Sequence, residues 1–228
     1  MRTMLLGTMM ALAAAAAAWA GEPELKTDEE KTIYALGLAM SQNLAAFNLS
    51  EKELGLVQAG LADGVLKREQ KVDLKTFGPK IPDLARARAK AAAEVNKKVA
   101  EPFLDKAAAE KGAKKTGSGL VYRELKAGSG DAPKATDTVK VHYTGTLSDG
   151  TVFDSSVQRG EPATFPLNGV IKCWTEGLQM MKVGGKAKLV CPSDVAYGDP
   201  GRPGIKPGAT LVFEVELVEI VKPEAPKK

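Results

Sequence analysis

Apolar residues in the first half of the chain recur at helical spacing behind two helix-start signals. The fragments TDEE (27–30) and SEKE (50–53) fit capping boxes, in which the first and fourth residues satisfy each other's backbone N–H groups. The first predicted helix carries two apolar stripes, and the second carries one: Ile33, Leu36, Met40, Leu44 and Phe47 with Tyr34 and Leu38, then Leu54, Val57, Leu61 and Val65. A helix with two apolar stripes needs partners on two sides. We therefore expect a homodimer held by residues before Pro82, with a self-contained bundle as the alternative.

A long stretch rich in alanine and charge, 82–112, predicts a third and extended helix. At about 1.5 Å per residue such a helix would reach ~46 Å, and Pro102 is expected to kink or disturb it. It is either a solvated surface helix or a stalk between two domains, and we favour the stalk because a complete second pattern follows. Its thin apolar seam consists of Leu84, Ala87, Ala91, Val95 and Val99.

From residue 116 the hydrophobic period changes to two, which predicts strands. Segments 138–147 and 151–154 flank an SDG turn at 148–150 and predict a hairpin. Between later strands, 174–181 predicts one short helix. In the last strand, Glu214 and Glu216 face away from Leu211, Phe213, Val215 and Leu217. The predicted fold class is α+β: an antiparallel β-sheet wrapped on one short helix, preceded by an all-helical domain with a long connecting helix.

The two ends of the chain predict an exported protein. Basic Arg2, the apolar run 4–17 and the AWA site at 18–20 have the pattern of a signal peptide cleaved near Ala20. We expect the periplasm or outer surface as the location, and no later segment is long enough for a membrane span. The expected domains are a signal peptide (1–20), a helical dimerisation domain with the long helix (21–115), a second domain (116–222) and a disordered tail (223–228).

Composition narrows the chemistry. The 228 residues are 44% hydrophobic and 26% charged, close to average soluble usage. A net charge of +4 without a basic tract interleaved with aromatics gives no support for a nucleic-acid partner. One His and two Cys offer no zinc-ligand spacing, so we expect no metal. His142 lies in the alternating run 139–143 and is interpreted as a strand residue without a catalytic role.

Seven short motifs follow one another along the second half. They are VHYTG (141–145), GTVFDSS (150–156), GVI (169–171), WTEG (174–177), VGG (183–185), AYG (196–198) and ATLVFEV (209–215). Together they closely resemble the FKBP-type peptidyl-prolyl cis–trans isomerases, over about 116–221. The preceding helices resemble the N-terminal dimerisation region of exported bacterial members, the macrophage infectivity potentiator type. The resemblance implies that 116–222 is an FKBP-like isomerase domain.

The resemblance also implies which residues form the site. Asp154 and Tyr197 would be the catalytic polar groups, Arg159 would support Asp154, and Ile171 would contribute a backbone donor. The substrate proline would sit on a floor made by Trp174. The implied lining of the pocket is Tyr143, Phe153, Phe165, Val170, Ile171, Trp174, Ile205 and Phe213.

Three positions depart from the family pattern: Cys173 stands for a glycine, Val157 for a frequent aromatic, and Lys206 for the first of two prolines. We expect a looser flap loop and an altered pocket rim from the last two. Cys173 and Cys191 are the two cysteines of a chain expected to be exported, which favours a disulfide. Two buried free thiols are the alternative.

Rotation about an X–Pro bond faces a barrier of about 18–20 kcal/mol and breaks no bond to a heavy atom. The reaction therefore requires no nucleophile, metal or cofactor, and we expect none. The expected function is isomerisation of X–Pro bonds during folding of exported proteins. Expected partners are proline-containing unfolded polypeptides and the family's macrolide ligands. The alternative is a periplasmic holdase chaperone or peptide-binding module that depends little on turnover.

Overall fold

The computed structural model of the chain describes residues 24–221. The predicted signal peptide (1–20) and tail (223–228) lie outside the described residues. Between residues 24 and 221, no helix combines the length and the hydropathy that crossing a membrane requires. Two compact units divide the chain, Met1–Leu38 and Ala39–Lys228.

Both predicted capping boxes form at the starts of the first two helices, α1 (Asp28–Gln42) and α2 (Glu51–Val65). At α1, the Glu30 N–H donates to Thr27 Oγ1 at 3.1 Å, and the Thr27 N–H donates to Glu30 Oε2 at 2.8 Å. Ser50 and Glu53 make the same reciprocal pair at α2. These local signals fix where each helix begins.

The apolar stripes of α1 and α2 are exposed. Ile33 on α1 is 63% exposed and Leu56 on α2 is 70% exposed, and neither helix buries a described residue. Each helix therefore presents apolar surface that packing within the described chain does not cover. Such surface is what the homodimer prediction requires, but it does not by itself show a partner.

Helix α4 (Ile81–Ala108) follows two short elements, α3 (Leu74–Phe77) and η2 (Gly78–Lys80), and continues through Pro102. All five residues of the thin apolar seam of this helix are exposed. The residues that α4 buries are instead Ala89, Ala93, Ala100 and Ala107. Small side chains let a neighbouring backbone approach closely, and a pattern read from larger apolar residues does not detect this.

Arg88 of α4 ties the helix to the segment around the start of α2. Its Nη1 donates to the Phe47 carbonyl at the end of η1 (Ala45–Phe47) at 3.2 Å and to Glu53 Oε2 at 3.0 Å. Its Nη2 donates to Glu53 Oε1 at 2.5 Å. These hydrogen bonds, with those from Ser50, lower the pKa of Glu53 to about 2. The capping glutamate of α2 therefore also anchors α4.

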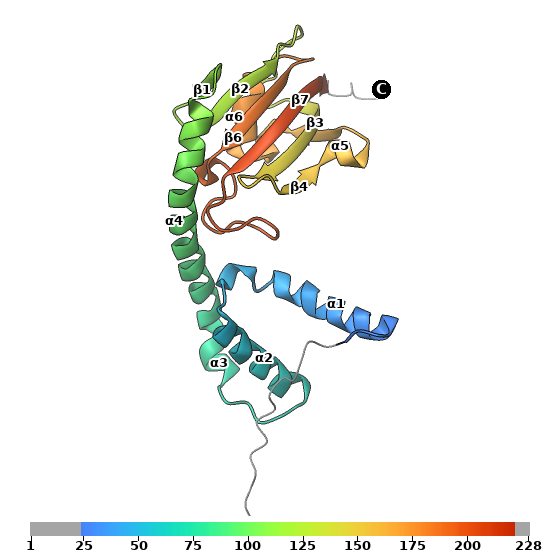
Figure 1. Ribbon diagram of the computed structural model, residues 1–228, viewed down its shortest axis with the longest axis vertical. Helices are drawn as coiled ribbons and strands as arrows, with labels where there is room; N and C mark the ends of the chain where they lie inside the picture. Colours follow the sequence, from blue (N-terminus) through green and yellow to red (C-terminus); the bar gives the residue numbers. More distant parts are fainter. Residues whose placement is uncertain (1–23, 222–228) are drawn as a thin grey trace, which may run out of the picture. The chain divides into compact units, whose positions relative to one another are not determined.

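In the described chain, seven strands form one antiparallel sheet in the order β1-β2-β6-β7-β3-β4, with β5 paired to β3 (Figure 1). The strands are β1 (Ala113–Lys115), β2 (Val121–Lys126), β3 (Thr138–Leu147), β4 (Val152–Ser155), β5 (Ala163–Pro166), β6 (Lys186–Cys191) and β7 (Leu211–Val221). The predicted hairpin and the predicted last strand are both present. The antiparallel sheet confirms the α+β prediction.

Helix α6 (Lys172–Gln179) packs on one face of the sheet and builds the main core. Trp174 and Leu178 of α6 are buried together with Leu189 of β6 and Val215 of β7. The remaining short elements are α5 (Ser156–Arg159), η3 (Leu167–Gly169) and η4 (Ser193–Val195). The structure thus has the single wrapped helix that the sequence predicts.

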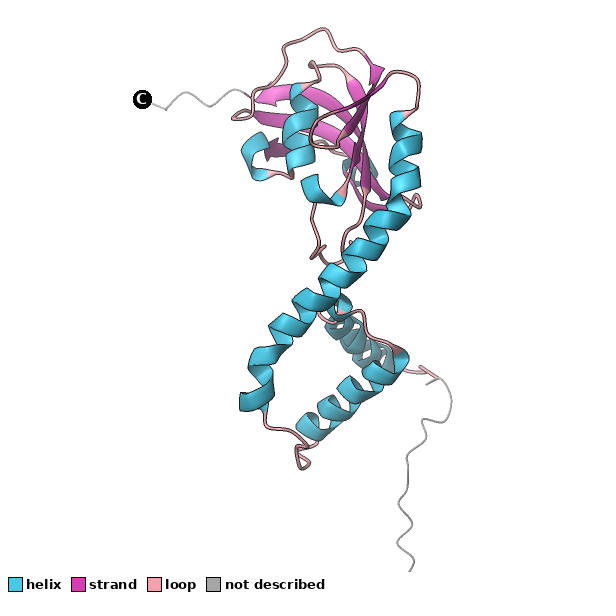
Figure 2. Cartoon of the chain, turned by 90° about the vertical axis from the view of Figure 1, so that its left-hand side faces the viewer, coloured by secondary structure: helices cyan, strands magenta, loops and turns pink. Residues whose placement is uncertain are grey.

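The C-terminal end of α4 packs on the sheet through a second cluster. Ala107 of α4 is buried against Val121 of β2 and Val190 of β6, with Phe103 and Leu104 beside them. Figure 2 shows one end of the long helix α4 beside the strands. Because β1 pairs with β2, the domain boundary expected at residue 115 falls inside the sheet.

Candidate functional site

The hairpin of β3 and β4 positions the first group of predicted site residues. Gly145 of β3 stands opposite Asp154 of β4 in the register. A Cβ at Gly145 would lie 2.7 Å from Phe153 Cζ and 2.9 Å from Phe213 Cε1. Only glycine leaves room for the two rings, which meet edge to face with centroids 5.7 Å apart. The glycine of the VHYTG motif thus shapes the aromatic wall.

A cavity of about 320 Å³ lies where these strands, α6 and the loop between η4 and β7 meet. Most of the predicted site residues line it. The lining residues are Tyr143, Phe153, Asp154, Phe165, Gly169, Val170, Ile171, Trp174, Tyr197, Arg202 and Phe213. The cavity is thus mostly aromatic and aliphatic, with polar groups from two directions.

Trp174 is the centre of the aromatic lining. Its ring meets Tyr143, Phe213 and Phe165 edge to face, at centroid distances of 5.0, 5.3 and 5.6 Å. Its side chain is almost completely buried, and its Nε1 has no hydrogen-bond partner among the described residues. Edge-to-face contacts hold each ring in a fixed orientation. The indole therefore forms a rigid wall for an apolar ligand group.

Asp154 and Tyr143 form the polar edge of the cavity, and Arg159, which is not among the lining residues, pairs with both. The Tyr143 hydroxyl donates to Asp154 Oδ2 at 2.5 Å, and Arg159 Nη1 donates to Asp154 Oδ1 at 2.5 Å. Arg159 Nη2 also donates to the Tyr143 hydroxyl oxygen at 3.2 Å. The three side chains form a closed ring of hydrogen bonds. Both carboxylate oxygens of Asp154 are therefore fixed in place.

This network sets the charge state of its members. Burial acts to raise the pKa of Asp154, but the hydrogen bonds from Tyr143 and Arg159 and the guanidinium charge outweigh it and hold the pKa below its usual range. Burial, with the hydrogen bond to Asp154, raises the pKa of Tyr143 above its usual value. At neutral pH the network holds an anionic carboxylate, a neutral phenol and a guanidinium cation.

Tyr197 and Arg202 approach the cavity from the loop between η4 and β7. Arg202 Nη1 donates to the Tyr197 hydroxyl oxygen at 2.9 Å, and its guanidinium lies 4.5 Å from the Tyr197 ring centroid. Arg202 and Gly169, which also line the cavity, were not among the residues expected from the sequence. The glycines of this loop were the available signal: Gly201 and Gly204 have φ of +64° and +80°, which let the loop fold back on itself.

Ile205 lies elsewhere than expected. It is 4% exposed and belongs to the buried core cluster, and it is absent from the residues that line the cavity. The backbones of Arg202 and Ile205 exchange two hydrogen bonds, of 3.0 and 2.8 Å. This narrow turn directs Arg202 to the cavity and buries Ile205. Val157 is 59% exposed on α5 and is also not among the lining residues.

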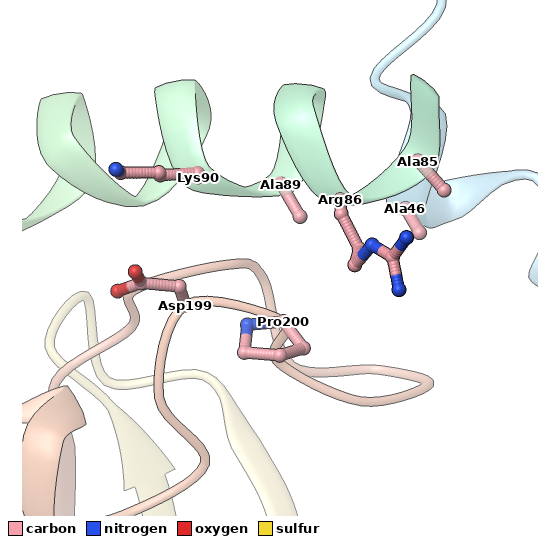
Figure 3. A pocket seen from close by; sticks show the side chains of 7 residues that line it. All are labelled: Ala46, Ala85, Arg86, Ala89, Lys90, Asp199 and Pro200. Atoms are coloured by element: carbon pink, nitrogen blue, oxygen red, sulfur yellow. The ribbon is translucent and has the colours of Figure 1, made fainter. Parts of the chain in front are cut away.

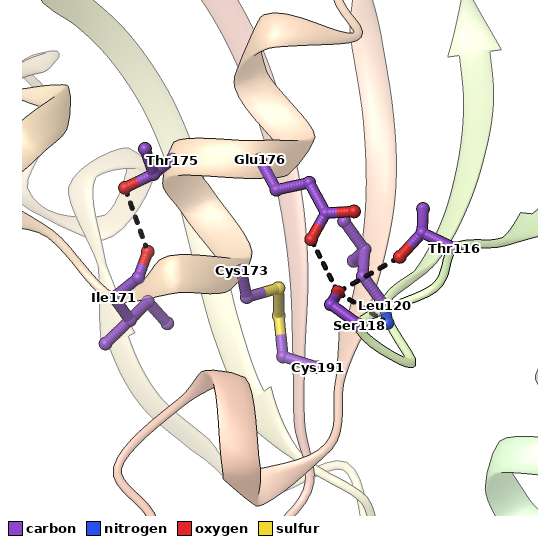
Figure 4. Close-up of a disulfide and its surroundings, with 8 residues drawn as sticks. All are labelled: Thr116, Ser118, Leu120, Ile171, Cys173, Thr175, Glu176 and Cys191. Atoms are coloured by element: carbon purple, nitrogen blue, oxygen red, sulfur yellow. Dashed lines mark hydrogen bonds between the residues drawn. A yellow bond between two sulfur atoms is a disulfide. The ribbon is translucent and has the colours of Figure 1, made fainter. Parts of the chain in front are cut away.

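Cys173 and Cys191 are joined by a disulfide, the pairing expected from the sequence (Figure 4). Their Cα atoms are 5.8 Å apart, and both residues are fully buried. The bond connects the first turn of α6 to the end of β6. Since Cys173 precedes Trp174 directly, the crosslink fixes the helix turn that carries the cavity wall.

His142 has a structural environment. Its Nδ1 lies 3.3 Å from the Ser156 hydroxyl oxygen, which accepts the Tyr143 N–H at 2.8 Å. Within residues 24–221, no group of three or more His, Cys, Asp or Glu side chains is arranged to hold a metal ion.

A second cavity, of about 400 Å³, lies between α4 and the loop that carries Tyr197 (Figure 3). Its lining is Ala46, Ala85, Arg86, Ala89, Lys90, Asp199 and Pro200. It lacks the aromatic rings and the carboxylate network of the first cavity. The first cavity is therefore the candidate active site.

An antiparallel sheet wrapped on one helix, with an aromatic cavity floored by an indole and edged by a fixed aspartate, defines the FKBP class of peptidyl-prolyl isomerases. The model of the FKBP-type peptidyl-prolyl cis–trans isomerase domain matches residues 130–218. The model of the domain amino-terminal to this isomerase matches residues 29–123. Two family models thus account for most of the described chain.

Relatives that match most of the chain support the same family. The chain is 47% identical to the FKBP-type peptidyl-prolyl cis–trans isomerase FkpA of Aeromonas hydrophila over 218 residues, 90% of this chain and 81% of the relative. It is 40% identical to FkpA of Escherichia coli K12 over 258 residues, 100% of this chain and 96% of the relative. The crystal structure of FkpA from Escherichia coli superposes with a TM-score of 0.62 at 39% identity, covering 89% of this chain and 100% of that one.

The chain belongs to the FKBP-type peptidyl-prolyl cis–trans isomerase family. It is an isomerase of X–Pro bonds, as the sequence predicts. The likeness to the macrophage infectivity potentiator type stays a prediction, since the relatives above are of the FkpA type.

Proposed function

We propose that the aromatic cavity binds the proline ring of the substrate and that Asp154 and Tyr197 are its catalytic polar groups. The observation that carries this proposal is the ionised Asp154, fixed by Tyr143 and Arg159 at the edge of a mostly apolar cavity. Phe153, Phe165, Val170, Ile171, Trp174 and Phe213 would surround the ring together with Tyr143. Ile205 would act indirectly, through the core.

The proposed mechanism is stabilisation of a twisted amide. A planar X–Pro amide is stabilised by charge-separated resonance, which water favours. Transfer into an apolar cavity weakens that stabilisation and favours the twisted form, in which the nitrogen and carbonyl carry less charge separation. Fixed charges and hydrogen-bond donors then select the twisted geometry. No proton transfer is needed, in agreement with a carboxyl whose pKa lies below its usual range.

In this proposal each polar residue has a separate role. The Asp154 carboxylate supplies a fixed negative field at the edge of the cavity, and Arg159 holds it in place. The Tyr197 hydroxyl donates to the substrate carbonyl, because its oxygen already accepts from Arg202 and its proton is free to point into the cavity. The N–H of Ile171 is the second donor.

We further propose that the enzyme acts on exported polypeptides, in the periplasm or at the outer surface. The signal-peptide pattern of residues 1–20 supports export. The disulfide between Cys173 and Cys191 supports an oxidising compartment. Clients would be unfolded or partly folded chains whose folding waits on proline isomerisation.

We propose a homodimer as the working form, supported by the exposed apolar residues of α1 and α2. Two active sites on one dimer would raise the effective concentration of sites for a client that carries several prolines. The same apolar surface supports the alternative function, a holdase chaperone that retains clients with little dependence on turnover.

Turnover of a short X–Pro peptide, with and without a macrolide competitor, tests the site assignment. We expect fast isomerisation that the macrolide abolishes by occupying the cavity. Aggregation of an unfolded client, measured with the same macrolide, separates the two functions. Suppression of aggregation that persists at full inhibition would favour the holdase.

A further inference from the structure

We propose that Asn96 and Lys97 of α4 are positioning residues for the isomerase reaction. They hold the loop 193–209, which brings Tyr197 and Arg202 to the cavity. This inference rests on the proposed role of Tyr197 as a site residue. It assigns to the long helix a part in the active site besides its role as a connection.

The far end of the loop is held against α4 by two contacts. Asn96 Nδ2 donates to the Pro207 carbonyl at 2.8 Å. The next residue, Gly208, lies directly on Ala93, which is fully buried: a Cβ at Gly208 would be 2.6 Å from the Cα and the carbonyl oxygen of Ala93. Gly208 also has φ of +67°, so glycine is required on two grounds.

The near end of the loop is held by Lys97. Its ammonium bridges Asp194 and Asp199, at 2.7 Å to each carboxylate. These two acidic residues lie on either side of Tyr197 along the chain, so one cation fixes the backbone before and after the tyrosine. The hydrogen bonds to both carboxylates raise the pKa of Lys97, which therefore stays charged.

The three α4 residues share one helix face, because positions 93, 96 and 97 are separated by three and four residues. Backbone hydrogen bonds connect the two held ends of the loop: Gly208 N–H donates to the Gly198 carbonyl at 3.1 Å, and Gly198 N–H donates to the Ser193 carbonyl at 2.8 Å. A shift at either end is therefore transmitted to Tyr197, which lies next to Gly198.

The helix itself is anchored to the sheet, so it can serve as a fixed support. Glu110, just beyond the end of α4, pairs with Lys188 of β6 and Arg123 of β2, at 3.0 Å in each case. Ala107 packs in the cluster on the same two strands. Helix α4 thus contacts both the sheet and the loop 193–209, and its contacts with the sheet fix its position beside the loop.

The contact between α4 and the loop is narrow. One helical turn before Ala93, the cavity of about 400 Å³ separates Lys90 and Ala89 from Asp199 and Pro200 (Figure 3). Arg86, also on this cavity, pairs with Asp83 of its own helix. In the described structure, no contact beside this cavity replaces those of Asn96 and Lys97. A single substitution of Asn96 or Lys97 should therefore change the position of Tyr197.

The test compares Lys97→Met with Lys98→Met in the full chain. Lys98 is the adjacent exposed residue of α4 and makes no ion pair among the described residues. We expect Lys97→Met to lower kcat/KM on an X–Pro peptide about two- to fivefold, with Lys97→Arg restoring most of it and Lys98→Met unchanged. Hydrogen exchange at the Gly208 amide should become faster in Lys97→Met alone. Unchanged kcat/KM in Lys97→Met would overturn the proposal.

A double mutant tells positioning from a general structural effect. If Lys97 acts through Tyr197, Lys97→Met should lower kcat/KM by a smaller factor in a Tyr197→Phe background than in the wild type. The same loss in both backgrounds would overturn the proposed route. The role of Tyr197 has its own readout: wild-type kcat/KM in the single variant Tyr197→Phe would refute the proposed function of that hydroxyl, whatever Lys97→Met does. Asn96→Ala provides an independent repeat at the other end of the loop.

Discussion

The hydroxyl of Tyr143 and the carboxylate of Asp154 are joined by a 2.5 Å hydrogen bond at the edge of the aromatic cavity. Tyr143 is also packed edge to face on Trp174. One side chain thus connects the apolar wall to the charged edge. The position of the Asp154 carboxylate relative to the cavity is therefore set by the aromatic core.

The first prediction concerns Asp154→Ala. Turnover of an X–Pro peptide should fall about ten- to a hundredfold, because a fixed charge beside the reacting amide is lost. The free energy of unfolding should fall only by the loss of the hydrogen bonds from Tyr143 and Arg159, since the residue fills no core volume. Enzyme kinetics and chemical denaturation of the same variant check both statements. Wild-type turnover in Asp154→Ala would contradict the electrostatic role.

The pH dependence follows from the lowered pKa of Asp154. A carboxyl with a lowered folded-state pKa contributes stability that is present above its unfolded-state pKa of about 3.9 and is lost as the pH falls through the folded-state value. The carboxyl therefore stays ionised down to about pH 5, and we expect turnover per folded enzyme to stay level from pH 7 to that pH. A fall within this range that Asp154→Asn removes would show that the carboxyl gains a proton there.

Phe213→Ala and Tyr197→Phe should differ in their effects, because Phe213 belongs to the buried core and Tyr197 acts only at the site. Phe213 is 3% exposed and contacts both Phe153 and Trp174, so its truncation should cost about 3–5 kcal/mol of stability as well as activity. Tyr197→Phe removes one hydroxyl and should raise the activation free energy of turnover by about 0.5–1.5 kcal/mol with little loss of stability. Unfolding curves and kcat/KM for both variants test this ordering. Equal losses of stability in the two would contradict it.

The disulfide should stabilise the segment that carries Trp174. Cys173 and Cys191 are 18 positions apart, and closing a loop of this size contributes about 3 kcal/mol in the chain-entropy account. Replacing both cysteines by alanine should lower the free energy of unfolding by about that amount. Thiol titration of unfolded, unreduced protein from the periplasm checks the bond itself. Two free thiols in that material would contradict its presence in the native enzyme.

Local signals in the sequence predicted the parts of the fold that local physics determines. The capping pairs of Thr27 with Glu30 and Ser50 with Glu53 form as expected. The turn at 148–150 joins β3 to β4 as predicted, since a glycine there adopts φ of +89°. These features depend on neighbours within a few residues, and they fix the hairpin that presents Asp154.

Features that depend on distant contacts were not predictable in the same way. Ala93 of α4 is buried where Gly208 packs closely on it, and nothing near Ala93 in the sequence signals that contact. For the same reason the sequence predicted Ile205 at the cavity and did not indicate Arg202, whereas Arg202 lines the cavity and Ile205 is buried in the core. A glycine-rich loop indicates a tight fold, but its path depends on the helix that supports it.

The last prediction concerns assembly and uses the exposed apolar residues of α1 and α2. In the described chain, Ile33 is 63% exposed and Leu56 is 70% exposed, so charging either one removes no internal packing. We expect Ile33→Lys and Leu56→Lys to convert a dimer into a monomer with an unchanged melting temperature of the isomerase domain. Val99→Lys, at a 73% exposed position on α4, is the matched control and should leave the dimer intact.

Sedimentation of the full-length chain and of the three variants at micromolar concentration distinguishes the outcomes. A dimeric wild type and control with monomeric Ile33→Lys and Leu56→Lys would assign the interface to these helices. A monomeric wild type would end the dimer proposal and leave the apolar surface for client binding. Turnover on a short peptide should be equal in monomer and dimer, because each cavity is lined by one chain. Refolding of a client with several prolines should be slower with the monomer, because two tethered sites raise the local concentration of enzyme.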